Sequence, residues 1–220
     1  MWDNATVMML AEGTAVTLYM TLVSTLFAYV LGLPMGIALV ITAKDGLRPN
    51  KIVYKILDAV VNIVRSIPFL ILLILVIPLT RAIVGQSYGA TATIVPLTLA
   101  AAPFIARMVE SSLLEVDRGV IEAAQSMGAG LWTIIWKVML GEARTSLIVG
   151  GTIALGTILG YSAMAGAVGG GGLGDIAIRY GYHRYQTDIM LVTVVLLVLL
   201  VQILQYIGTK LSTRLDTRLK

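Results

Sequence analysis

Long apolar segments alternate with short charged segments along this chain of 220 residues. A helix needs about 20 apolar residues to cross the hydrocarbon core of a bilayer, and five segments approach or exceed that length. The pattern therefore predicts an all-α integral membrane protein with about five transmembrane helices. The expected spans are approximately residues 14–43, 66–84, 90–106, 146–168 and 189–209. The connections are short, so we expect a single transmembrane domain over residues 1–220.

Composition agrees with this interpretation. Hydrophobic residues make up 58% of the chain, and charged residues make up 13%, against about 25% in soluble domains. The chain has one histidine, His183, and no cysteine, so we predict no catalytic residue and no metal site. His183 lies among tyrosines, which is typical of a membrane interface.

The distribution of Lys and Arg predicts the orientation of the spans. Three of these residues fall in connections on one side of the expected membrane: Arg81, Arg179 and Arg184. Thirteen fall on the other side: Lys44, Arg48, Lys51, Lys55, Arg65, Arg107, Arg118, Lys137, Arg144, Lys210, Arg214, Arg218 and Lys220. The positive-inside rule makes the second side cytoplasmic, with the N-terminus outside and the C-terminus in the cytoplasm. The charges are spread between apolar segments, so nucleic acid is not a predicted partner.

The connection between the third and fourth spans, residues 118–143, is amphipathic. Asp117 is placed to cap a helix from Arg118 to Met127, and Gly128 and Gly130 interrupt it. A second helix should then present Leu131, Ile134, Ile135 and Val138 on one face. The pattern fits either a docking surface for a cytoplasmic partner or a hairpin at the membrane interface in which Glu122 is solvated.

The same connection resembles a known signature. Glu122, Ala123 and Ala124, followed by three residues and Gly128, are similar to the EAA motif of the permease subunits of ABC importers. The resemblance implies that this segment is a coupling helix that inserts into an ATP-binding subunit, with Glu122, Ala123, Ala124, Gly128 and Ala129 at the contact. Gly141 stands where the family pattern has proline, which leaves the geometry after the second helix open.

Three further segments resemble the permeases of methionine-importing ABC transporters: residues 65–69 (RSIPF), 94–115 and 160–175. This resemblance implies a homodimer in a bacterial cytoplasmic (inner) membrane, two cytoplasmic ATP-binding subunits and an extracytoplasmic substrate-binding protein. The expected function is methionine import by alternating access. The alternatives are an importer for another small amino acid or related compound, a channel or exporter, a membrane scaffold, and a membrane enzyme.

The chain contains no G-x-x-x-x-G-K-[ST] phosphate-binding loop. The glycine-rich segment 169–174 has no lysine and lies on the expected outer side. We therefore predict a transport subunit and not an enzyme, with no cofactor in this chain and with ATP and Mg in the partner ATPase.

The fourth span is the predicted wall of the translocation pathway. Its glycines favour close helix packing, and Tyr161, Ser162 and Met164 follow at its outer half. These three side chains are suited either to contact an amino acid or to close a gate. Arg65 is either an anchor at the membrane interface or a group near a substrate carboxylate. Gly32 and Gly36 flank Pro34, so they are expected at a bend.

Overall fold

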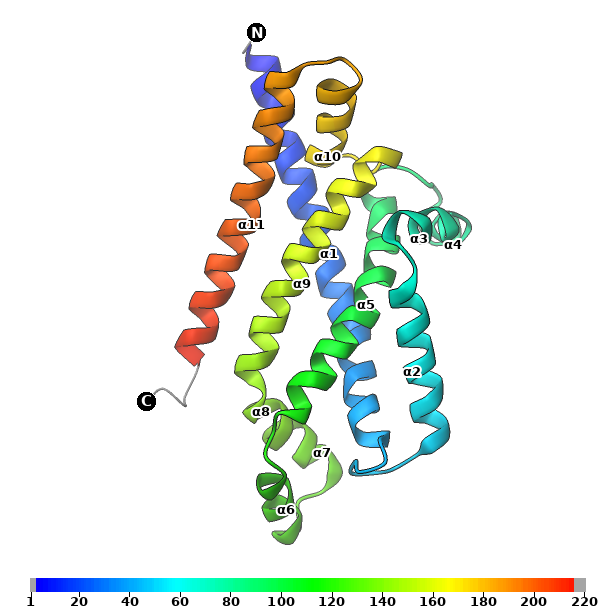
Figure 1. Ribbon diagram of the computed structural model, residues 1–220, viewed down its shortest axis with the longest axis vertical. Helices are drawn as coiled ribbons and strands as arrows, with labels where there is room; N and C mark the ends of the chain where they lie inside the picture. Colours follow the sequence, from blue (N-terminus) through cyan, green and yellow to red (C-terminus); the bar gives the residue numbers. More distant parts are fainter. Residues whose placement is uncertain (1–2, 216–220) are drawn as a thin grey trace.

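The computed structural model describes residues 3–215, and within that range it contains helices and no strands (Figure 1). The expected all-α fold is confirmed. Arg218 and Lys220, which entered the orientation argument, lie outside the described residues. The α-helices are α1 (Asn4–Thr42), α2 (Lys51–Ser66), α3 (Phe69–Leu75), α4 (Ile77–Val84), α5 (Ala90–Leu114), α6 (Arg118–Ser126), α7 (Leu131–Thr133), α8 (Leu140–Glu142), α9 (Arg144–Ala165), α10 (Gly172–Ile176) and α11 (Thr187–Leu215). Two π-helical segments, η1 (Ile134–Met139) and η3 (Ala177–Tyr182), and the 3₁₀ turn η2 (Gly166–Val168) complete the described secondary structure.

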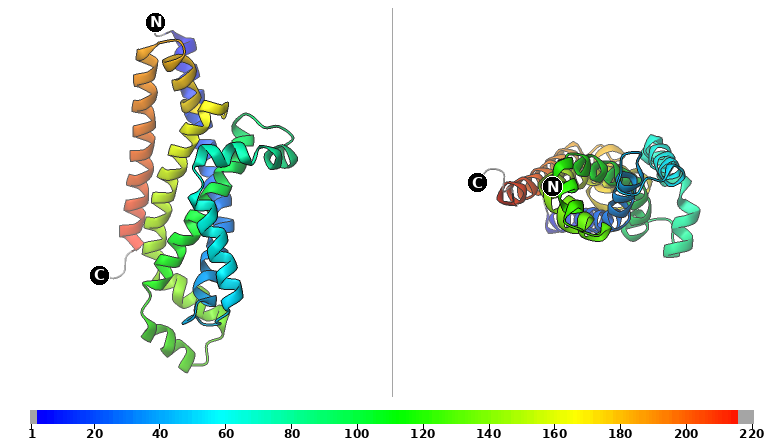
Figure 2. Two further views of the ribbon diagram at one scale, coloured as in Figure 1. Left: turned by 45° about the vertical axis from the view of Figure 1, so that its right-hand side comes forward. Right: turned by 90° about the horizontal axis from the view of Figure 1, so that it is seen from below.

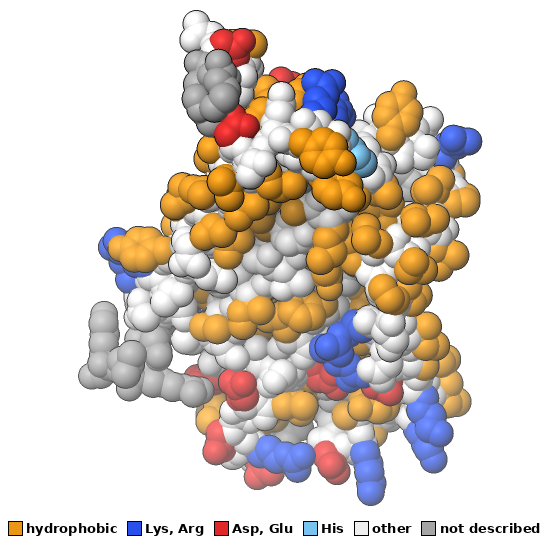
Figure 3. Space-filling model, turned by 45° about the horizontal axis from the view of Figure 1, so that its top comes forward, with side chains coloured by type: hydrophobic (Ala, Val, Ile, Leu, Met, Phe, Trp, Pro, Cys, Tyr) orange, Lys and Arg blue, Asp and Glu red, His pale blue; other side chains and the backbone are white. Residues whose placement is uncertain are grey.

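Four of these helices are long and apolar enough to cross a membrane: α1, α5, the helix that begins at Arg144, and α11. A fifth crossing arises if the bent pair of α2 and α3 is one broken span. Hydrophobic side chains cover the middle of the face in Figure 3, and charged side chains gather toward its lower edge. The described part of the chain therefore has the surface pattern of a multi-pass membrane protein.

The core of the bundle is the contact between α1 and α5, which is the most extensive one between any two helices. A Cβ atom at Gly32 would lie 2.6 Å from the carbonyl oxygen of Ala102, and one at Gly36 would lie 2.6 Å from that of Ala106. The helix α1 continues through Pro34. Gly32 and Gly36 let the backbones of α1 and α5 approach closely, a role that was not assigned to them from the sequence.

The helix α1 begins at a capped end. Asp3 accepts hydrogen bonds from the backbone nitrogen of Thr6 at 2.9 Å and from its hydroxyl at 2.7 Å. These bonds stabilise the charged carboxylate and lower the pKa of Asp3 below its ordinary value. The cap fixes the first turn of a helix 39 residues long.

The expected span at 66–84 is divided between two short helices, α3 and α4, that turn away from α2. The axes of α2 and α3 differ by 106° at a break of two residues, Ile67 and Pro68. Ile67 is extended, with φ −82° and ψ 124°, as the residue before a proline prefers. In Figures 1 and 2, α2 runs along the bundle, and α3 and α4 project from its side.

The segment α6–α8 forms one end of the molecule, and α10 with η3 forms the opposite end (Figure 1). At that opposite end, the Thr17 hydroxyl of α1 accepts a hydrogen bond from the backbone nitrogen of Leu173 at 2.9 Å and donates one to the carbonyl of Gly13 at 2.8 Å. Gly89 donates a further backbone bond to Gly169 at 2.9 Å. These bonds hold the glycine-rich segment against α1 and the start of α5.

Candidate functional site

The first part of the candidate coupling segment has the local geometry that its sequence predicts. Asp117 accepts a hydrogen bond from the backbone nitrogen of Gly119 at 2.6 Å and so caps α6. The helix gives way after Met127 to Gly128, whose φ of 78° lies in the left-handed region. Glycine adopts this conformation without the steric cost that a Cβ atom brings. The predicted cap and glycine break are confirmed.

The residues of the EAA motif divide into an inner and an outer face of α6. Ala124 is buried and belongs to the same apolar cluster as Ile134 of η1. Glu122 and Ala123 are exposed, and Ala129 is half-buried. Ala124 therefore fastens α6 to the bundle, and Glu122 and Ala123 are available on the outside.

A cavity of about 1110 Å³ lies between α6, the end of α5 and the loop that joins α1 to α2. Glu122 and Gln125 line it from α6, and Lys44, Lys51 and Lys55 line it from the facing loop and α2. The cavity therefore brings an exposed carboxylate and several ammonium groups to the same end of the bundle.

The second half of the segment is helical, but its turns are wider than expected. Most of the residues expected on one face of an α-helix lie in the π-helix η1, in which Ile134 and Ile135 are buried. Trp132 and Trp136 point outward and are 70% and 58% exposed. Gly141 lies in α8, where an added Cβ would meet no atom within 4 Å. The chain is therefore helical across the position where the family pattern has proline.

The three expected pathway residues do not share one surface. Tyr161 stacks on Phe69 of α3 with ring centroids 4.7 Å apart and planes 5° from parallel. Met164 is 49% exposed. Ser162 is buried, and its hydroxyl donates to the carbonyl of Leu159 in its own helix at 2.8 Å. Tyr161 and Met164 are accessible in this conformation, whereas the Ser162 hydroxyl is already bonded.

A second, smaller cavity of about 140 Å³ lies beside the stacked rings. Four of its lining residues come from α2, the bend and the start of α3, two come from α5, and one comes from α9: Val64, Arg65, Ile67, Phe69, Ala100, Phe104 and Tyr161. The cavity therefore lies where the bend between α2 and α3 meets α5 and α9.

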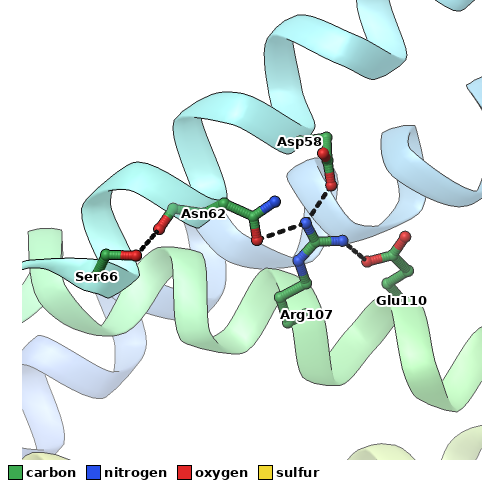
Figure 4. Close-up of polar contacts among 5 residues, drawn as sticks. All are labelled: Asp58, Asn62, Ser66, Arg107 and Glu110. Atoms are coloured by element: carbon green, nitrogen blue, oxygen red, sulfur yellow. Dashed lines mark hydrogen bonds and ion pairs between the residues drawn. The ribbon is translucent and has the colours of Figure 1, made fainter.

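A polar cluster joins α2 to α5 and was not identified from the sequence (Figure 4). The guanidinium of Arg107 bonds to Asp58, to the side-chain oxygen of Asn62 at 2.9 Å and to Glu110 at 2.6 Å. The signal in the sequence was the spacing of polar residues in α2, which recur every three or four positions and so share one helix face.

The family of binding-protein-dependent transport system inner membrane components matches residues 28–219. The chain belongs to this family. It is accordingly a membrane permease of the ABC importer type, a transport subunit and not an enzyme.

Among individual proteins, relatives with high sequence identity are named as permeases for D-methionine. The permease is 54% identical over 210 residues to the probable D-methionine transport system permease protein MetI of Vibrio cholerae, covering 96% of this chain and 93% of that protein. It is 52% identical over 158 residues to the D-methionine transport system permease protein MetI of Escherichia coli, covering 72% of this chain and 73% of that protein. The resemblance identified from the sequence is confirmed.

Solved structures of ABC transporters also match this chain. An inward-facing conformation of the MetNI methionine ABC transporter matches with a TM-score of 0.96 and 48% identity, covering 98% of this chain and 100% of the other. An amino acid ABC transporter matches with a TM-score of 0.73 and 19% identity, covering 97% of this chain and 99% of the other. The second match concerns the fold alone.

Proposed function

We propose that this permease is the membrane subunit of an ATP-driven ABC importer that moves methionine into the cell. The observation that carries this proposal is the match to the MetNI methionine transporter across nearly the whole of both chains. The relatives named as D-methionine permeases support the same substrate.

The assembly we propose contains two copies of this chain, two cytoplasmic ATP-binding subunits and an extracytoplasmic substrate-binding protein. ATP and Mg belong to the ATP-binding subunits. The bacterial cytoplasmic (inner) membrane is the proposed location, with the N-terminus outside and the C-terminus in the cytoplasm. The excess of Lys and Arg on the side of the α6–α8 segment supports this orientation.

The proposed contact with the ATP-binding subunit is the outer face of α6 and the turn after it. The proposed coupling residues are Glu122, Ala123, Ala124, Gly128 and Ala129, of which Ala124 is buried and holds α6 from its inner face. The exposed carboxylate of Glu122 can accept charge-assisted hydrogen bonds, and the left-handed Gly128 sets the angle between α6 and the following helical stretch. For ATP binding in the partner to change the conformation of the permease, this surface must bind the ATP-bound and ATP-free states of the partner with different affinities. Equal affinities would shift no conformational equilibrium.

Tyr161 and Met164 are the proposed pathway or gate residues of α9, and Ser162 supports them from the packed face of the helix. Tyr161 is already in contact with α3 through its ring stack with Phe69. Because α3 belongs to the broken span, a relative movement of α9 and α3 would separate these rings and change the access to the cavity beside them.

The proposal is tested with the complete transporter in proteoliposomes. We expect Glu122→Lys to lower methionine uptake and substrate-stimulated ATP hydrolysis by roughly tenfold, because it reverses a charge at the docking surface. The matched control is Glu142→Lys, which makes the same change at an exposed residue of α8 and should transport normally. Normal coupling in Glu122→Lys would contradict the proposed docking surface. Import of a different amino acid instead of methionine by the wild-type transporter would contradict the proposed substrate.

A further inference from the structure

One face of α2 carries a continuous line of polar side chains, although its opposite face is apolar. These residues, called here the polar stripe, are Lys51, Lys55, Asp58, Asn62 and Arg65. Their spacings of four, three, four and three residues place them on one helix face. Ile52, Ile56 and Ile63 are exposed elsewhere on the helix. The two faces of α2 therefore suit two different environments.

The middle of the polar stripe is bonded to α5, and its first two residues border a cavity. Lys51 and Lys55 line the large cavity at the α6 end of the bundle. Asp58 and Asn62 bond to Arg107 of α5 (Figure 4). Arg65 differs from Asp58 and Asn62, since among residues 3–215 its side chain has neither an ion pair nor a hydrogen bond.

Arg65 is exposed at the end of α2 that adjoins the bend. Fourteen residues separate it from Lys51, a rise of about 21 Å along an α-helix, whereas the hydrocarbon core of a bilayer is about 30 Å thick. A phospholipid headgroup beside Lys51 is thus too far away to reach Arg65. The exposed guanidinium of Arg65 is therefore open to a ligand from the cavity that it lines.

The small cavity beside Arg65 combines a cation with aromatic surfaces. Arg65 and Val64 line it from α2, Phe104 lines it from α5, and the stacked pair of Phe69 and Tyr161 lines it from α3 and α9. A guanidinium binds a carboxylate through two parallel hydrogen bonds. The rings offer an apolar surface to a thioether, with which aromatic rings make favourable contacts.

We propose that this cavity is a transit site for an α-amino acid inside the membrane, in which Arg65 binds the substrate carboxylate and the Phe69 and Tyr161 rings contact its apolar side chain. The inference rests on the proposed import function and adds the residues that receive the substrate. The cavity is smaller than the roughly 300–1000 Å³ of a complete small-molecule site. In this conformation it therefore accepts one end of the substrate, and separation of α9 from α3 would enlarge it.

The experiment uses the complete transporter with its ATP-binding subunits and binding protein in proteoliposomes. Arg65→Gln removes the charge, and Arg65→Lys keeps the charge without the two parallel hydrogen bonds. Arg81→Gln is the matched control, because Arg81 is an exposed arginine of α4 that does not line the cavity. We expect Arg65→Gln to lower labelled methionine uptake by roughly ten- to a hundredfold, the effect of losing a hydrogen bond to a charged group. Arg65→Lys should be intermediate, and the control Arg81→Gln should leave basal ATP hydrolysis unchanged.

A second measurement does not depend on any variant. A methionine analogue with a diazirine in its side chain is photolysed during wild-type turnover, and the labelled peptides are identified by mass spectrometry. Labelling within residues 64–69, 100–104 or 157–164 is the expected result, and Arg65→Gln should abolish it whereas Arg81→Gln should not. A purely structural role for Arg65 would lower the yield of assembled transporter in Arg65→Gln and leave the labelling per assembled transporter unchanged.

The outcomes separate this inference from the proposed function. Wild-type methionine uptake with equal rates in Arg65→Gln and Arg81→Gln, or labelling confined to other peptides, would overturn the transit site alone. Wild-type uptake of another amino acid would overturn the substrate, and the same Arg65 comparison made with that amino acid would still decide the transit site. Uptake of a compound without a carboxylate would overturn both.

Discussion

Arg107 of α5 forms an ion pair with Asp58 of α2, a residue 49 positions earlier in the chain. The pair fastens the first half of the broken span to the core of the bundle. Glu110, one turn further along α5, holds the other side of the guanidinium at 2.6 Å. The cluster lies on the α2 face that also carries Arg65.

Breaking this pair should weaken the contact between α2 and α5. We expect Asp58→Asn and Arg107→Gln each to cost about 1 kcal/mol, less than the roughly 1.5–3 kcal/mol of a buried charged hydrogen bond, because 34% of the Asp58 side chain is exposed. Thermal unfolding in detergent should show Tm falling by about 2–4 °C. The double variant should lose less than the sum of the two single losses. Asp45→Asn is the control, since the Asp45–Arg118 pair is exposed and 3.9 Å long. Strictly additive losses would contradict the direct interaction.

Gly128 and Gly130 allow one substitution to be compared in two backbone conformations. Neither has an atom within 4 Å of an added Cβ, but φ is 78° at Gly128 and −71° at Gly130. Gly128→Val should force the turn out of the left-handed region, at a cost of roughly 1–2 kcal/mol or more. We expect fewer methionine molecules imported per ATP in Gly128→Val and nearly normal import in Gly130→Val. Equal ratios in the two variants would show that the turn geometry is unimportant for coupling.

Close packing of α1 on α5 predicts a strong effect at Gly36. An added Cβ there would lie 2.6 Å from the Ala106 carbonyl oxygen and 2.6 Å from the Cβ of Val109. A backbone carbonyl cannot move without shifting its helix, so Gly36→Ala should cost about 1–3 kcal/mol. Gly141→Ala, where nothing lies within 4 Å, should instead be neutral or stabilise by up to about 1 kcal/mol. Tm measurements on both variants in the same detergent test the comparison.

Thr17 and Thr25 form a matched pair on α1. Both hydroxyls donate to a carbonyl four residues earlier, but the Thr17 hydroxyl also accepts the bond from Leu173. Thr17→Val should leave the buried nitrogen of Leu173 unpaired, at a cost of about 1–3 kcal/mol. In Thr17→Val we therefore expect faster backbone hydrogen exchange across residues 169–174. Thr25→Val should leave exchange there unchanged, and faster exchange in both variants would point to a general weakening of α1.

Local features could be predicted from the sequence because neighbouring residues determine them. Asp117 bonds to a nitrogen two residues later, and Gly128 adopts a conformation that other residues avoid. The apolar lengths of α5 and α11 likewise reveal spans without knowledge of their neighbours. These signals suffice for the fold class and for the position of the coupling segment.

Features that depend on distant residues could not be predicted in the same way. A search for segments without charge assigns residues 51–65 to a connection, because Lys51, Lys55, Asp58 and Arg65 interrupt the apolar residues. The structure makes them one face of α2, with Asp58 paired to Arg107 of α5. The expected span at 66–84 ran through Pro68 without a break, because the 106° bend there depends on how α3 packs against α5 and α9.

The ring stack between Tyr161 and Phe69 is sensitive to the tilt of α9, because Tyr161 lies near the end of this helix that is far from the α6–α8 segment. About 25 Å of helix separates Arg144, next to the coupling segment, from Tyr161. A tilt of about 10° at the coupling end would swing Tyr161 by roughly 4 Å over that length, which is comparable to the 4.7 Å between the ring centroids. If the ATP-binding subunit docks on α6 as proposed, a small rotation at that end of α9 would therefore make or break the single aromatic contact between Tyr161 and Phe69.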